Sequence, residues 1–122
     1  MGGARGKNRT WVSREVTPEK LVAFFHDKTH THLQASQAAK AYIGKWMKYS
    51  GPIHDVRSGY ISFADPANPD RMGLVSASFD DGWDDRLGIL HPKMQVLIEG
   101  QIRSVDSWSI SLHHCSLNDE NL

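Results

Sequence analysis

Cysteine, long apolar runs and an excess of positive charge are scarce or missing in this 122-residue sequence. The single cysteine, Cys115, permits no disulfide within the chain and excludes zinc or iron–sulfur sites built from several thiolates of one chain. No stretch approaches the roughly 18 consecutive apolar residues that a membrane-spanning helix requires. Basic and acidic residues number 14 each, which argues against strong unspecific binding to nucleic acid, since such binding needs a basic surplus.

The composition that remains is that of one globular domain, with 39% hydrophobic and 23% charged residues. The charges are divided unevenly along the chain. Residues 1–57 hold ten Lys or Arg and four Asp or Glu, and residues 58–122 hold four and ten. This asymmetry either places a basic face beside an acidic one or lets the two halves attract each other in the folded state.

The chain begins with a Gly-rich, basic segment that lacks the apolar region of a signal peptide. We predict a flexible basic arm over residues 1–16 and a single domain over residues 17–122. Without a signal, the expected location is cytoplasmic. The alternative is secretion or lipid anchoring, if an upstream segment has been removed.

Two helices are predicted to precede the rest of the domain. Thr17, Pro18 and Glu19 are typical of a helix start, because they supply a cap, a favourable first residue and an acid near the positive end of the dipole. A polar stretch over 26–32 interrupts the pattern. Apolar residues then recur at helical spacing from Ala35 to Tyr42.

From Lys45 onward the apolar period changes to two, which predicts strands. A bend is expected near Gly51, and a bulge at His113 and His114. The predicted elements are strands at 45–53, 60–64, 71–79, 94–105 and 108–117, with a loop at 65–70 and a short helix within 80–90. Five strands with a helix between the third and the fourth is the order of an OB-fold. We therefore predict an all-β, five-stranded OB-fold barrel with an N-terminal two-helix extension.

Several segments resemble the tRNA anticodon-binding-like OB-fold proteins, which are small, mostly bacterial and mostly uncharacterised. The segments are AYIGKWMKYSG at 41–51, FDD at 79–81 followed by Trp83, and QVLIEGQI at 95–102. The resemblance covers residues 17–118. It implies the barrel, and it implies no catalytic residues because the family has no agreed catalytic set. Some relatives resemble secreted or lipid-anchored proteins.

Aromatic and basic side chains are predicted around the ligand-binding face of the barrel, where OB-folds hold single strands. The candidate nucleic-acid-binding residues are Trp46, Lys48, Arg57, Tyr60, Arg71, Arg103 and Trp108. The predicted function is a non-enzymatic module that binds single-stranded DNA or RNA. Half-buried packing of these rings in the barrel is the alternative interpretation. A protein–protein interaction module, or a small-ligand or metal sensor, are the alternative functions.

Three further clusters contain residues that can bind a metal or catalyse a reaction, but each has a simpler structural interpretation. His26, His30 and His32 lack the intervening glutamate of an HExxH motif. The run DDGWDD at 80–85 is typical of a helix start. Cys115 is expected to be a small buried residue, although His113 shares its face of the strand. We therefore expect neither a catalytic residue, nor a metal site, nor a cofactor.

Overall fold

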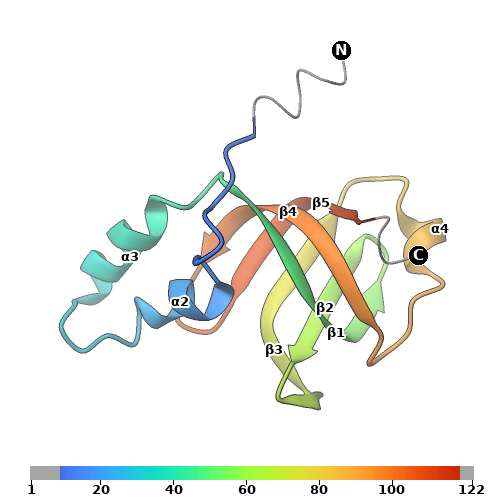
Figure 1. Ribbon diagram of the computed structural model, residues 1–122, viewed down its shortest axis with the longest axis horizontal. Coiled ribbons are helices and arrows are strands. Elements are labelled where there is room, and N and C mark those ends of the chain that lie inside the picture. Colours follow the sequence, from blue (N-terminus) through green and yellow to red (C-terminus); the bar gives the residue numbers. More distant parts are fainter. Residues whose placement is uncertain (1–8, 119–122) are drawn as a thin grey trace.

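The computed structural model describes residues 9–118. Within this range five strands close into a barrel in the order β1-β2-β3-β5-β4, where β3 and β5 pair in parallel and the other neighbours are antiparallel (Figure 1). The strands are β1 (Trp46–Arg57), β2 (Tyr60–Asp65), β3 (Asn68–Phe79), β4 (Gln95–Val105) and β5 (Ile110–Leu117). This arrangement confirms the predicted fold class, because it is the topology of an OB-fold barrel.

The helices lie outside the barrel wall. They are α2 (Pro18–Ala23), α3 (His32–Lys40) and α4 (Asp84–Leu87). In Figure 1, α2 and α3 lie on one side of the barrel, with α3 farther out, and α4 lies on the opposite side. Thr17 caps α2, as predicted, and accepts a hydrogen bond from the backbone N–H of Lys20. Thr31 and Gln34 form a capping box that starts α3 at His32, the last residue of the stretch expected to be a polar break.

The barrel interior is filled by alternate residues of the strands, as the period of two predicts. Ile61 and Phe63 of β2, Ile98 and Ile102 of β4, and Leu112 of β5 are fully buried. The predicted bulge in β5 is confirmed: the pairing shifts there, and His114 has a φ of 52°. Cys115 and Leu117 then face inward.

Three local predictions were wrong in their extent. The loop predicted at 65–70 is reduced to residues 66–67, because Asp65 accepts a hydrogen bond from the N–H of Ala67 and β3 begins at Asn68. The helix predicted within 80–90 covers 84–87 only. The irregularity expected near Gly51 lies farther along β1, where the pairing with β2 shifts after Ile53.

Part of the predicted arm is ordered against the barrel. Residues 1–8 lie outside the described range, but the segment from Arg9 onward runs beside the start of β1 (Figure 1). The N–H of Trp46 donates to the carbonyl of Thr10 at 2.8 Å, and the N–H of Val12 donates to the carbonyl of Trp46 at 2.9 Å. These bonds align Trp11 with Trp46 in a short parallel bridge. In residues 9–118 no helix is long and apolar enough to cross a membrane.

Candidate nucleic-acid interface

The parallel bridge before α2 places two tryptophans side by side on the outside of the barrel. The ring centroids of Trp11 and Trp46 are 6.4 Å apart, and the rings are tilted by 50°. Trp11 keeps 41% of its surface exposed, and Trp46 is half-buried. Trp46 faces outward because the neighbouring Met47 faces the core. The pair therefore presents indole surface to solvent at the start of β1.

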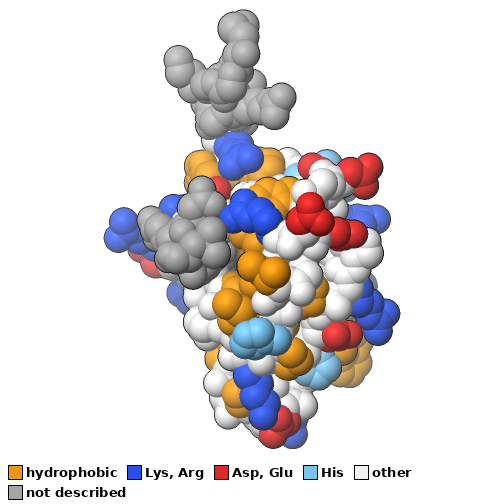
Figure 2. Space-filling view, turned by 90° about the vertical axis from the view of Figure 1, so that its right-hand side faces the viewer, with side chains coloured by type: hydrophobic (Ala, Val, Ile, Leu, Met, Phe, Trp, Pro, Cys, Tyr) orange, Lys and Arg blue, Asp and Glu red, His pale blue; other side chains and the backbone are white. Residues whose placement is uncertain are grey.

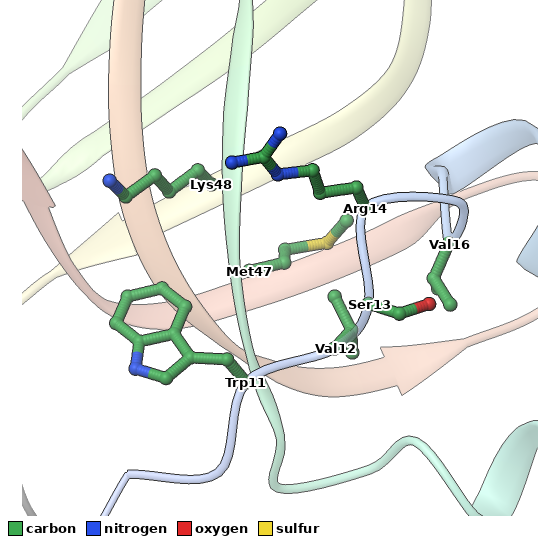
Figure 3. A pocket seen from close by; sticks show the side chains of 7 residues that line it. All are labelled: Trp11, Val12, Ser13, Arg14, Val16, Met47 and Lys48. Carbon is green, nitrogen blue, oxygen red and sulfur yellow. The ribbon is translucent and has the colours of Figure 1, made fainter.

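Basic side chains surround this pair. The Arg9 guanidinium lies over the Trp46 ring, 3.9 Å from the ring centroid, in a cation–π contact. Arg14 and Lys48 line a cavity of about 370 Å³ together with Trp11, and Met47 forms part of its wall. In Figure 3, Trp11 and Lys48 extend to the same side of β1, and the Arg14 guanidinium reaches towards Lys48. We call Arg9, Trp11, Arg14, Trp46 and Lys48 the tryptophan surface.

One carboxylate lies beside the tryptophan surface. Glu99 of β4 is the cross-strand partner of Lys48. Its two oxygens lie 3.7 Å from Lys48 Nζ and 3.8 Å from Arg9 Nη1. The three basic side chains Arg9, Arg14 and Lys48 outnumber this carboxylate. The area around the tryptophan surface is therefore locally positive, although the net charge of the protein is zero.

Tyr60 and Arg57 lie at a different place, on the outer face of β1, β2 and β3. They line a cavity of about 340 Å³ with His54, Asp55, Ser62 and Met72. This is the strand face on which the sequence predicted binding. Arg57 is paired with Asp55 (Nε to Oδ2, 3.4 Å), so the cavity has little net charge. Among the described residues, the buried Nδ1 of His54 lacks a hydrogen-bond partner.

Trp108 lies in an exposed turn before β5. It was expected to start the last strand and to share a face with Ile110, but β5 begins at Ile110 and Trp108 is 79% exposed. Asp106 closes the turn by accepting hydrogen bonds from the N–H groups of Trp108 and Ser109, at 2.8 and 2.7 Å. His26 also holds the turn, through a 2.8 Å hydrogen bond from Nε2 to the carbonyl of Ser107.

The remaining basic candidates are separate. Arg71 is exposed near the start of β3, and Arg103 is exposed on β4, two residues beyond Gln101, which pairs with Trp46. Figure 2, which views the side that faces right in Figure 1, spreads Lys and Arg among acidic and apolar side chains. The structure therefore brings Trp46 and Lys48 together, brings Arg57 and Tyr60 together elsewhere, and leaves Trp108 on its own turn.

The sequence reasoning missed three members of the tryptophan surface, because Arg9, Trp11 and Arg14 fall in the segment predicted as a flexible arm. The sequence did contain a signal that this segment packs against the barrel. Trp11 and Val12 are adjacent residues that favour strands, and such residues are untypical of a solvated, flexible arm.

The other clusters have structural roles. His30 Nδ1 pairs with Asp27 at 3.0 Å, and His114 Nδ1 pairs with Asp80 at 2.9 Å. In residues 9–118 no group of three or more His, Cys, Asp or Glu is arranged to hold a metal ion. Burial raises the pKa of the Cys115 thiol to about 12. At neutral pH it is therefore protonated and a poor nucleophile.

No family model and no curated protein matches this sequence. A solved structure does: the crystal structure of a "putative nucleic acid-binding lipoprotein" from Klebsiella pneumoniae subsp. pneumoniae MGH 78578. It is 21% identical to this chain and aligns with a TM-score of 0.59 over 96% of this chain and 97% of that one. The likeness shows that the two chains share an OB-like fold over nearly their whole lengths.

Proposed function

We propose that this protein is a non-enzymatic module that binds single-stranded nucleic acid, and that the tryptophan surface is its contact site. The observation that carries the proposal is the pairing of Trp11 with Trp46 among three basic side chains. Bases stack on aromatic rings with little regard to sequence, while Lys and Arg follow the phosphates. Both requirements are met within one small area.

The roles divide by position. Trp11, the more exposed ring, offers its surface to a base. Trp46 supports it from β1 and is itself held by Arg9. Arg14 and Lys48, at the adjoining cavity, are placed to neutralise phosphates. Since one surface with few cations carries the contact, binding should be moderate in affinity, and its salt dependence should be shallow, about 0.7 units of slope for each phosphate engaged.

Two further points support the proposal. The OB-like fold commonly binds oligonucleotides, although one fold hosts many functions. The Klebsiella neighbour is described as a "putative nucleic acid-binding lipoprotein". Membership of the tRNA anticodon-binding-like family is part of this proposal and rests on the sequence resemblance and on the OB-like fold. Cytoplasmic location stays a prediction, and the neighbour's description as a lipoprotein favours testing the lipid-anchored alternative.

The proposal is tested by fluorescence polarisation with labelled single-stranded DNA and RNA at low and at physiological salt. We expect saturable binding whose logarithm falls linearly with the logarithm of salt concentration. Trp11→Ala should weaken it about tenfold, because stacking of one base contributes ~1–3 kcal/mol. Trp108→Ala, a matched control at an exposed tryptophan outside the surface, should leave it unchanged.

Two results would contradict the proposal. The first is the absence of binding at low salt. The second is an equal loss in the Trp11 and Trp108 variants, which would move the contact away from the tryptophan surface. Circular dichroism of each variant separates lost binding from lost folding.

A protein–protein interaction module is the second candidate, because apolar side chains are exposed at the outer helix. Leu33 of α3 is 66% exposed, and Ile43, in the turn after it, is 41% exposed. If oligonucleotides fail to bind, these two residues are where a partner should be sought.

A further inference from the structure

Glu99 is held between two cations of the tryptophan surface. Oε1 faces Lys48 Nζ at 3.7 Å, and Oε2 faces Arg9 Nη1 at 3.8 Å. The two cations come from different segments, since Lys48 is on β1 and Arg9 precedes the bridge to Trp46. One carboxylate thus ties the segment before α2 to the barrel at the point where the tryptophans meet.

Without the Glu99 carboxylate, Arg9 and Lys48 would offer two cations to a phosphate group. A phosphate, like a carboxylate, offers oxygens to two cations at once, and arginine binds either group well. Both distances are near the long end for an ion pair. The Lys48 side chain is 57% exposed, and those of Arg9 and Glu99 are 29% and 24% exposed. The long distances weaken both pairs, and water screens the Lys48 pair as well. Another anion can therefore replace Glu99 at the two cations.

We propose that Arg9 and Lys48 form a binding site for a phosphate group, and that Glu99 occupies this site in the free protein as an internal competitor. The inference rests on the proposed function for the identity of the natural ligand, a phosphodiester of a single strand. A bound strand replaces the carboxylate with a phosphate while a base stacks on Trp11. Glu99 then lowers the affinity for every strand whose phosphate must displace it, and it does not affect a contact made by stacking alone.

The test compares Glu99→Gln with the unaltered protein, using a labelled oligothymidylate and fluorescence polarisation. Glutamine keeps the shape of the side chain and removes its charge. We expect the variant to bind about two- to fivefold more tightly, the scale of exposed ion pairs. Its salt dependence should steepen by up to about one unit of slope, because the variant leaves no displaced carboxylate to take up a cation from solution.

Two control variants make the result specific. Glu15→Gln removes a charge from the same N-terminal segment, at a carboxyl hydrogen-bonded to Ser13 rather than placed between Arg9 and Lys48. It should leave binding nearly unchanged. Lys48→Ala, added to Glu99→Gln, should remove the gain. No gain in Glu99→Gln, or an equal gain in Glu15→Gln, would overturn the inference.

A second probe separates this inference from the proposed function. Tripolyphosphate carries the anion without any base, and its binding is read from the indole N–H resonances of the tryptophans. We expect it to shift the Trp46 resonance at lower concentration in Glu99→Gln than in the unaltered protein. If oligonucleotides fail and tripolyphosphate binds in this way, the proposed function is wrong and the phosphate site stands. If tripolyphosphate shifts nothing in either protein, the site is wrong.

Discussion

Gly100 shows how closely single residues are fitted in this barrel. It lies within β4, opposite Met47 of β1. A Cβ atom at this position would lie 2.5 Å from Cys115 Sγ and 3.1 Å from Leu112 Cβ. Both neighbours are buried on β5, so neither can move into solvent. A glycine is therefore needed for β4 and β5 to pack at their observed separation.

We predict that Gly100→Ala lowers the free energy of unfolding by about 1–3 kcal/mol, the range for overpacking a core. Chemical denaturation measures the loss. Adding Cys115→Ala removes the nearest obstacle, so the double variant should lose less than the sum of the two single variants. Strict additivity, or an unchanged stability of Gly100→Ala, would show that the contact is not the cause.

At the scale of elements, Asp84 joins α4 to the turn between β1 and β2. Its Oδ1 accepts a hydrogen bond from the N–H of Gly59 at 2.7 Å, and Oδ2 accepts one from the Ser58 hydroxyl. The Ser58 hydroxyl, followed by the Gly59 N–H, lowers the pKa of Asp84 below its usual range. One aspartate of the DDGWDD run thus fastens a barrel turn, in addition to starting a helix.

The lowered pKa gives this tether a defined pH dependence. The folded state favours the ionised carboxylate, so its contribution is present above the unfolded pKa, about 4, and is lost as pH falls through the folded value. We predict that Asp84→Asn lowers the melting temperature at neutral pH, and that the difference from the unaltered protein shrinks below about pH 4. Asp85→Asn, on the same helix, serves as the control. A gap that persists in acid would contradict the role of the charge.

At the scale of the whole molecule, a segment outside the barrel completes the candidate site. Arg9 and Trp11 meet the barrel through the backbone bridge to Trp46. Val12 and Val16 of the same segment pack partly against the core. The barrel strands supply Trp46 and Lys48, but the second ring and two of the cations come from this segment. Removing this segment should therefore abolish most of the binding while the barrel stays folded.

Truncation tests that separation. A chain that begins at Ser13 loses Arg9 and Trp11 but retains every strand. We expect it to keep the β-rich circular dichroism spectrum and to lose most oligonucleotide binding in fluorescence polarisation. A chain that begins at Arg9 is the control and should retain the larger part of the binding. Equal binding by both truncated chains would place the contact outside the tryptophan surface.

The sequence pattern predicted the elements where side chains alone carry the signal. Thr17 and Pro18 marked the start of α2, and the alternation around Ile98 and Ile102 marked β4. The pattern failed where backbone pairing or side-chain caps decide. Asn68 begins β3 although its neighbours are typical of a loop, because strands can pair without burying their side chains. Trp108 was predicted to belong to the last strand but lies outside β5, because Asp106 accepts a hydrogen bond from its N–H and closes a turn there.

The sequence by itself determined the order of the elements and the OB-like barrel, because burial imposes a period on the chain that is readable without coordinates. It also named Trp46 and Lys48 among the candidate binding residues, and both lie on β1. Only the tertiary structure decided that Trp11 joins them and that Glu99 lies between Arg9 and Lys48. Those contacts depend on backbone hydrogen bonds and cross-strand register between distant segments, which leave no periodic trace in the sequence.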